Sequence, residues 1–141
     1  MTVLVDTSVW SLALRRQGKD LNPDQKQIAQ ELAELIQETR AQLIGPVRQE
    51  LLSGIRDQAQ HDKLRRDLRA FDHVPLQLED YEEAARASNL CRAEGVLGSP
   101  VDFLICAVAL RRNWHVFTID GDFTNYAKYL ALRLHSPRSS R

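Results

Sequence analysis

Apolar residues along this chain follow two alternating patterns. Short apolar runs with β-branched residues, such as Val3-Leu4-Val5, predict strands that are buried on both faces. Between them lie longer segments with apolar residues at helical spacing, which predict amphipathic helices. The strands are expected at 3–5, 42–44, 73–76, 115–118 and 132–134. The helices are expected around 9–13, 23–40, 46–55, 64–71, 79–94, 100–110 and 123–130.

Strands that alternate with helices indicate an α/β fold. We expect three layers, with a central and mostly parallel sheet between helices, because helical crossovers join parallel strands. The strand at 73–76 contains Pro75 and is expected near an edge of the sheet. A length of 141 residues with 43% apolar content fits one domain, which we place at residues 1–135. Residues 136–141 are expected to form a flexible basic tail.

Acidic residues stand at equivalent places in this pattern. Asp6 directly follows the first strand, and Asp120 and Asp122 follow the strand at 115–118. Asp102 lies in the first turn of the most apolar helix, and Glu50 lies one turn into another helix. The carboxyl ends of parallel strands meet at one edge of a sheet, where ligands bind in open α/β folds. The acids are therefore expected to converge at that edge.

Helix capping is the alternative interpretation of these acids. Asp6 can accept backbone N–H bonds in the turn that follows it, and Ser99 with Asp102 is close to a capping box. Favourable helix ends return only about 0.3 to 1 kcal/mol each. Two carboxylates roughly 4 Å apart repel by about 4 kcal/mol at an effective dielectric of about 20. Capping alone does not explain a cluster of acids, whereas a divalent cation would.

The donor atoms favour particular metals. Ligands that are all oxygen suit Mg²⁺ or Mn²⁺, whereas zinc prefers histidine or cysteine. None of the 4 histidines stands beside an acid of this set. Cys91 and Cys106 lie in helical segments without metal-type spacing, and we interpret them as buried thiols, with a disulfide as the minor alternative.

Net charge and hydropathy exclude fewer classes of function than the acidic residues do. Lysine plus arginine and aspartate plus glutamate number 19 each, so net charge argues neither for nor against nucleic acid. Residues 48–69 are rich in arginine, but interspersed acids favour a solvated helix face over a nucleic-acid surface. The longest apolar run, 103–110, is less than half a membrane span, and the start of the chain lacks signal-peptide order. We therefore expect a cytoplasmic protein that does not bind membranes.

Four short motifs together resemble a known family. They are Asp6-Thr7-Ser8-Val9-Trp10, an isolated Glu50, Asp102-Phe103-Leu104-Ile105-Cys106-Ala107, and Thr118-Ile119-Asp120-Gly121-Asp122-Phe123. In order and spacing they resemble the PIN-domain ribonucleases, and most of all the VapC-type toxins of toxin-antitoxin pairs. The resemblance spans nearly the whole chain. Cys106 stands where alanine is more usual, which is expected to affect packing and not chemistry.

This resemblance implies a fold, an activity and a site. The fold is a parallel sheet of five strands with helices on both faces, and the activity is Mg²⁺-dependent endoribonuclease cleavage, with Mn²⁺ as a possible substitute. The implied residues are Asp6, Glu50, Asp102 and Asp120 as metal-site acids, Asp122 as an accessory acid, and Ser8 and Thr118 as hydroxyls that orient those acids or a metal-bound water. A metal-activated water is expected to cleave RNA and to leave a 5′ phosphate and a 3′ hydroxyl.

The resemblance also implies partners beyond the RNA substrate. A small antitoxin protein is expected to bind the toxin, and a homodimer is expected. Exposed apolar residues of short helices would form the antitoxin groove. The residues considered are Val9, Trp10 and Leu14, or Leu51, Leu52 and Ile55, although each of them individually fits the hydrophobic core better.

Two other classes of function remain open at this stage. A non-catalytic RNA-binding module would keep the fold, although retention of every expected acid argues against it. A phosphoryl-transfer domain also uses an aspartate after its first strand. A dehalogenase-type site would want a second aspartate at position 8, where this chain has Ser8, and no lysine follows a later strand as in a receiver domain.

Overall fold

The computed structural model describes residues 1–15 and 20–138 of the chain. Part of the polar segment after the first helix and the last residues of the predicted tail lie outside the described residues. The strands are β1 (Val3–Val5), β2 (Ala41–Gln42) and β3 (His115–Phe117). The helices are α1 (Thr7–Arg15), α2 (Pro23–Gln37), α3 (Gly45–Leu52), α4 (Gln58–Leu68), α5 (Leu78–Ala93), α6 (Pro100–Arg112) and α7 (Asp122–Tyr126).

The sheet is parallel, with β1 at its centre. Its strand order is β2-β1-β3, and Val3 pairs with Ala41 on one side and with His115 on the other. All three residues of β1 are fully buried, which confirms the prediction from their apolar run. Because β1 is central, the residue that follows it emerges in the middle of the carboxyl edge.

The prediction of five strands was wrong, because the sheet in the described part of the chain has three. The two outer segments each form a single parallel bridge, Ile44 with Val74 and Val116 with Leu134. Pro75 lacks an N–H and stops the ladder beyond Val74. Ile44 is already the N-cap of α3, so that β2 has no length left for a longer pairing.

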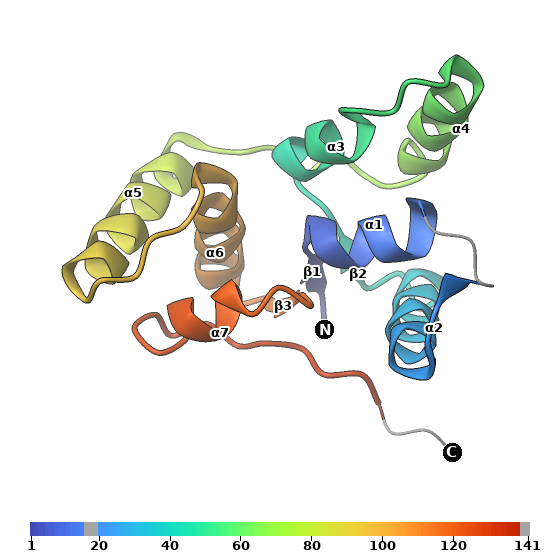
Figure 1. Cartoon of the computed structure of the whole chain (residues 1–141). Coiled ribbons are helices and arrows are strands. Elements are labelled where there is room, and N and C mark those ends of the chain that lie inside the picture. Colours follow the sequence, from blue (N-terminus) through green and yellow to red (C-terminus); the bar gives the residue numbers. More distant parts are fainter. Residues whose placement is uncertain (16–19, 139–141) are drawn as a thin grey trace.

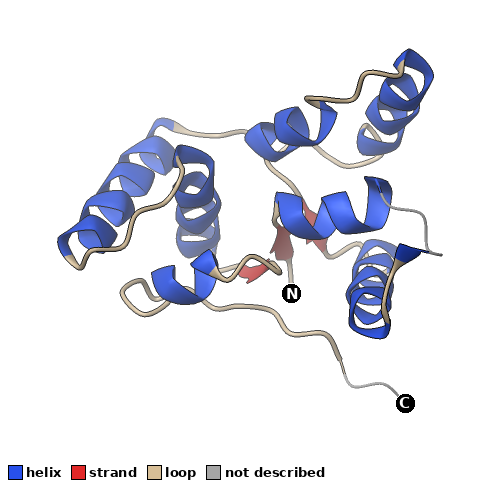
Figure 2. Cartoon of the chain, viewed as in Figure 1, coloured by secondary structure: helices blue, strands red, loops and turns tan. Residues whose placement is uncertain are grey.

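Helices cover both sides of the sheet. Figure 1 shows α5 and α6 on one side of the strands and α1 to α4 on the other, and Figure 2 shows the short strands enclosed between them. α5 packs along α6, and α1 packs against α2 and α3. The apolar segment of α6 is buried nearly all round, as its sequence predicts. The first turn of α6 thereby places Asp102 at the carboxyl edge of the sheet, where Asp6 follows β1.

The helix ends carry residue types that suit them. Asn22 caps α2 in a reciprocal capping box, and Gly95 ends α5 with a φ of 78°. Cys91 and Cys106 are buried free thiols, which confirms the interpretation from the sequence. Across the described ranges 1–15 and 20–138, no helix combines the length and apolar character that crossing a membrane requires.

Candidate metal centre

Asp6 lies at the carboxyl end of β1 and is only 5% exposed. Its Oδ2 accepts hydrogen bonds from Ser8 Oγ at 2.7 Å and from Thr118 Oγ1 at 2.9 Å. The capping contact from the Ser8 backbone N–H is longer, at 3.4 Å. Burial raises the pKa of Asp6, and the hydrogen bonds from Ser8 and Thr118 oppose the rise. The two hydroxyls therefore hold this carboxylate more closely than the helix terminus does.

The same two hydroxyls fix the loop after β3. Ser8 Oγ accepts the Ile119 N–H at 3.1 Å, and Thr118 Oγ1 accepts the Asp120 N–H at 3.0 Å. Since each oxygen accepts a backbone N–H, its own hydrogen is available to Asp6. The contacts of Thr118 with Asp6 and of Ser8 with Ile119 connect residues more than a hundred positions apart. Together with the Asp120 N–H bond to Thr118, they place Asp120 near the end of β1.

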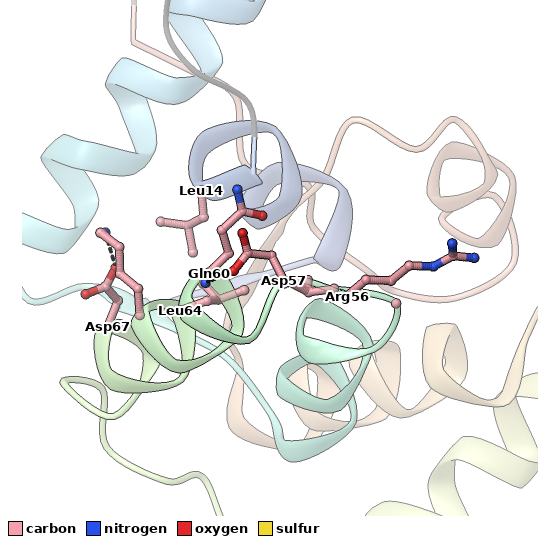
Figure 3. Close-up of a pocket in the computed structure, with 9 residues that line it drawn as sticks. Leu14, Arg56, Asp57, Gln60, Leu64 and Asp67 are labelled. Carbon is pink, nitrogen blue, oxygen red and sulfur yellow. Dashed lines mark hydrogen bonds and ion pairs between the residues drawn. The ribbon is translucent and has the colours of Figure 1, made fainter.

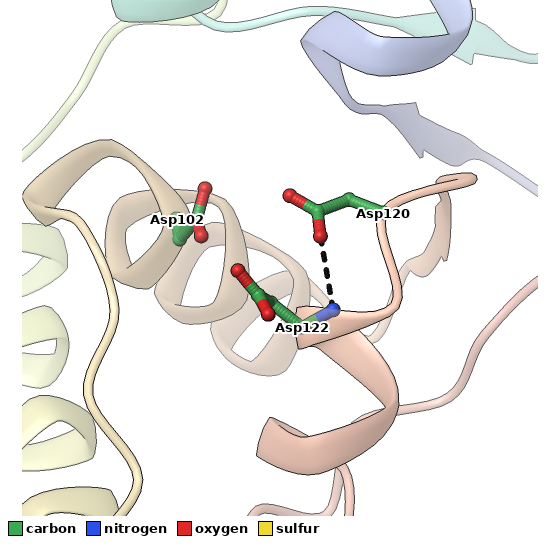
Figure 4. Close-up of side chains that lie close together, drawn as sticks. All are labelled: Asp102, Asp120 and Asp122. Carbon is green, nitrogen blue, oxygen red and sulfur yellow. Dashed lines mark hydrogen bonds between the residues drawn. The ribbon is translucent and has the colours of Figure 1, made fainter.

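Asp102, Asp120 and Asp122 come together in one group. One carboxylate oxygen from each lies within 4.8 Å of the others, and Figure 4 shows the three side chains facing one another. Asp120 Oδ1 accepts the Asp122 backbone N–H at 2.9 Å, which fixes the turn into α7. The structure thus brings together three of the predicted acids from α6, from the loop after β3 and from the start of α7.

Asp102 is half-buried, and the charges of other acids act on its carboxylate. Its backbone N–H donates to Ser99 Oγ at 3.1 Å, so Ser99 caps α6 while the Asp102 carboxylate is left for other contacts. Burial raises the pKa of Asp102, and the charges of Asp6 and Asp120 add to the rise. Asp6 therefore lies within electrostatic reach of the group, and the repulsion among the acids is what a divalent cation would relieve.

Glu50 lies at the margin of this arrangement. It is exposed on α3, and its Oε1 accepts a hydrogen bond from Thr7 Oγ1 at 2.7 Å. Thr7 follows Asp6 directly, so Glu50 is tied to the end of β1 and is not part of the group of three aspartates. Sequence reasoning overlooked Thr7, although its hydroxyl inside the first motif was a visible signal.

Tyr126 is a second residue that sequence reasoning placed only as an apolar position of a helix. Its hydroxyl donates to Asp102 Oδ2 at 2.6 Å. Burial and the neighbouring Asp102 charge raise the pKa of this phenol, so it remains a hydrogen-bond donor. The signal in the sequence was a phenol four residues after Asp122.

The donor chemistry fits a hard divalent cation. The grouped ligands are all carboxylate oxygens, as Mg²⁺ and Mn²⁺ prefer, and no histidine or cysteine joins this group in the described residues. Cys106 is fully buried in the hydrophobic core, and burial together with the Asp102 and Asp6 charges raises the pKa of its thiol.

A separate pocket of about 500 Å³ lies between the end of α1 and α4 (Figure 3). It is lined by Leu14, Gly54, Ile55, Arg56, Asp57, Gln60, Lys63, Leu64 and Asp67, and by none of the predicted site acids. Among the residues considered for an antitoxin groove, Val9, Trp10 and Leu51 are fully buried and belong to the core. Leu14 and Ile55 reach the pocket, and Leu52 is half-buried.

A parallel α/β fold with an aspartate cluster at its carboxyl edge indicates an α/β protein that binds a divalent metal ion. Comparison with known proteins identifies its family. The family model described as PIN domain matches residues 3–129. The chain therefore belongs to the PIN-domain family. Members of this family are generally nucleases that depend on a divalent metal ion.

Solved structures share this fold at low sequence identity. FitAcB from Neisseria gonorrhoeae is 21% identical, with a TM-score of 0.74 over 96% of this chain and 98% of that chain. VapBC2 from Rickettsia felis, bound to a DNA fragment from its promoter, is 16% identical, with a TM-score of 0.75 over 96% and 98%. VapBC-1 from nontypeable Haemophilus influenzae is 14% identical, with a TM-score of 0.71 over 96% and 97%. A search of curated proteins returns no match.

Proposed function

We propose that this chain is a Mg²⁺-dependent endoribonuclease and the toxin of a toxin-antitoxin pair. The observation that carries the proposal is the group of Asp102, Asp120 and Asp122 at the carboxyl edge, with Asp6 beside it. Four acids in electrostatic contact are costly without a cation and suited to holding one. The family and its solved relatives support the nuclease and toxin parts of the proposal.

In this proposal Asp6, Asp102 and Asp120 hold the ion, and Asp122 and Glu50 contribute directly or through water. Bound Mg²⁺ supplies Lewis-acid activation of water and charge neutralisation at the phosphodiester. Ser8 and Thr118 keep Asp6 in a fixed orientation, and Thr7 keeps Glu50 near the end of β1. No histidine is required, and the products are a 5′ phosphate and a 3′ hydroxyl.

RNA cleavage by the purified chain tests the activity. We expect cleavage in Mg²⁺ or Mn²⁺, none in EDTA, and a loss of about a hundredfold or more in Asp6→Asn, because that substitution removes a buried ligand charge. Asp24→Asn makes the same chemical change at an exposed position of α2 and serves as the control. Cleavage that survives EDTA or Asp6→Asn contradicts the proposal, and tight binding of RNA that stays intact supports a non-catalytic module instead.

The antitoxin is expected to cover the pocket between α1 and α4. Leu14 is 36% exposed there, and Ile55 is partly buried beside it. A structure from Klebsiella pneumoniae that is described as a toxin-antitoxin complex shares the fold with a TM-score of 0.63 over 86% of this chain, which supports a small protein partner. Co-expression with the protein encoded next to this chain should give a stable complex and relieve toxicity. Leu14→Asp should weaken the complex, whereas Leu97→Asp, at a residue 71% exposed outside the pocket, should not.

A homodimer is the remaining proposed assembly. Leu78 and Tyr81 of α5 are 71% and 52% exposed and lie about one turn apart, which leaves apolar surface at the start of this helix. Light scattering at micromolar concentration should give twice the mass of the chain. Tyr81→Glu should shift that mass toward the monomer, and a wild-type monomer over the whole concentration range contradicts the assignment.

A further inference from the structure

Tyr126 contacts one of the acids of the candidate metal centre. It is the last residue of α7 and is fully buried, yet its hydroxyl donates to Asp102 Oδ2 at 2.6 Å. The bond occupies one oxygen of a carboxylate whose other contacts lie among the acids. The hydroxyl of the large, buried Tyr126 side chain thus binds Asp102, which the proposed function assigns to the metal.

Aromatic packing fixes the ring of Tyr126 from two directions. Its centroid lies 4.9 Å from that of Phe103 and 5.1 Å from that of Phe123. Phe103 follows Asp102 in α6, and Phe123 follows Asp122 in α7. The ring is therefore held against both helices that carry grouped acids, and its hydroxyl has little freedom to move away from Asp102.

Gly98 closes the third side of the phenol. A Cβ at this position would lie 2.2 Å from Tyr126 Oη and 2.7 Å from Cζ, far inside van der Waals contact. It would also lie 2.9 Å from Cε2 of Phe103. The backbone that leads into α6 can approach the hydroxyl this closely only because residue 98 has no side chain.

We propose that Tyr126, enclosed by Gly98, is a positioning residue of the metal centre: its hydroxyl sets the orientation in which the Asp102 carboxylate meets a divalent cation. This inference rests on the proposed function of the same site. A neutral donor fixes the carboxylate plane without cancelling its charge, which is what a hydrogen-bonded partner of a metal ligand contributes. Loss of the Tyr126 hydroxyl is therefore expected to lower the affinity for the metal and to change the rate of the chemical step little.

Metal binding by Tyr126→Phe tests the inference directly. Mn²⁺ affinity, measured by titration calorimetry or electron paramagnetic resonance on the whole chain, should fall by about tenfold or more in Tyr126→Phe. The Mg²⁺ concentration for half-maximal cleavage should rise by the same factor, while kcat at saturating Mg²⁺ changes by less than about threefold. Tyr129→Phe removes a hydroxyl from a tyrosine that is 43% exposed in the same segment and should change neither value.

Two further variants separate positioning from a general structural role. Gly98→Ala keeps the hydroxyl but displaces it, and it should reproduce the loss of Mn²⁺ affinity. In an Asp102→Ala background, Tyr126→Phe should cause no further loss, because the residue acts through Asp102. Equal, additive losses in both backgrounds would instead mean that Tyr126 only supports the fold. Thermal unfolding of each variant checks that the chain remains folded.

The outcomes distinguish this inference from the proposed function. Wild-type protein that binds Mn²⁺ but leaves RNA intact contradicts the nuclease, while the Tyr126 variants still test positioning. Unchanged Mn²⁺ affinity in both Tyr126→Phe and Gly98→Ala overturns the positioning role and leaves the nuclease standing. Wild-type protein without Mn²⁺ affinity overturns both.

Discussion

At the scale of single residues, the site depends on neutral hydroxyl groups beside buried carboxylates. Ser8 and Thr118 both donate to Asp6 Oδ2, and Tyr126 donates to Asp102 Oδ2. These bonds lower the cost of keeping charged carboxylates in a region that is largely withdrawn from water. The orientation of the proposed ligands is therefore set by their partners as much as by the backbone.

Loss of one such hydroxyl should weaken the site without unfolding the chain. Ser8→Ala removes the 2.7 Å bond to Asp6 and the contact with the Ile119 N–H. We expect RNA cleavage at limiting Mg²⁺ to fall by about tenfold, within the range for partners of metal ligands. Ser11→Ala, at a half-buried position of the same helix, should retain activity. Equal activity of Ser8→Ala and wild type would contradict a role for this hydroxyl.

Charge repulsion should make the metal-free site a local weakness. The pKa of Asp102 is raised by burial and by Asp6 and Asp120, so its ionised form is less favourable in the folded chain than in the unfolded chain. This destabilisation is present above the raised folded-state pKa and is relieved as pH falls through it. Asp102→Asn should therefore stabilise metal-free protein at pH 7, while abolishing cleavage.

Denaturant unfolding in EDTA and in Mg²⁺ checks this prediction. Mg²⁺ should stabilise wild type by mass action and should stabilise Asp102→Asn much less. A variant that is less stable than wild type in EDTA, or that gains equally from Mg²⁺, would contradict repulsion among these acids.

At the scale of elements, α6 must be held firmly because it carries Asp102. Asp80 of α5 is fully buried and accepts hydrogen bonds from Arg111 at 2.6 Å and from Arg112 at 2.8 Å, both in the last turn of α6. Its Oδ2 also accepts the Gln77 N–H at 2.8 Å. A buried carboxylate with two arginines connects the start of α5 to the end of α6.

Removing the charge of Asp80 should loosen this connection. Burial opposes ionisation, but hydrogen bonds from Arg112, Gln77 and Arg111 outweigh it and lower the pKa of Asp80 from 3.8 to about 2. Because the folded pKa is depressed, the stabilisation is complete above about pH 4 and is lost as pH falls toward 2. Asp80→Asn should cost about 2 kcal/mol at pH 7.

Urea unfolding at pH 7 and at about pH 3 measures this cost. The difference between wild type and Asp80→Asn should shrink at the lower pH, and Glu79→Gln, at the exposed neighbouring position, should behave as wild type. A difference that is independent of pH would mean that the ion pairs do not stabilise the contact between α5 and α6.

Element boundaries show where sequence patterns sufficed and where they failed. Periodicity located each helix of the described residues, although α4 begins at Gln58, six residues before its predicted start. These helices bury an apolar stripe or, in α6, are buried nearly all round. It overestimated the sheet, because a short alternating segment such as 132–134, with Arg133 exposed between two leucines, can lie beside a strand and pair with it only once. Strand length depends on hydrogen bonds to a neighbour, which the run itself does not encode.

At the scale of the whole molecule, the site exists only because distant segments meet at one edge. Parallel pairing of β1 with β3 brings the loop after Phe117 beside Asp6, and α7 then brings Asp122 toward Asp102. The position of each acid after a strand or at a helix start was visible in the sequence, and the family resemblance supplied their roles. The phenol of Tyr126 and the hydroxyl of Thr7 are visible in the sequence, but their partners Asp102 and Glu50 are determined by packing, so neither residue was predicted for the site.

The segment near the C-terminus makes further long-range contacts. Arg138 pairs with Glu31 at 3.0 Å and with Glu38 at 2.8 Å, and His135 Nε2 lies 2.6 Å from the buried Glu31 carboxylate. These contacts connect the segment after Leu134 to α2. The first residues of the predicted tail are thus attached to the domain, whereas the exact domain boundary stays a prediction.

The most direct test of the central claim is the chemistry of RNA ends produced by purified wild type, Asp120→Asn and Asp24→Asn in Mg²⁺ and in EDTA. The account predicts new 5′ phosphate and 3′ hydroxyl ends from wild type and Asp24→Asn, in Mg²⁺ only, and none from Asp120→Asn. Cleavage by Asp120→Asn at the wild-type rate, cleavage in EDTA, or 2′,3′-cyclic phosphate ends would contradict a carboxylate-held metal as the source of the activity.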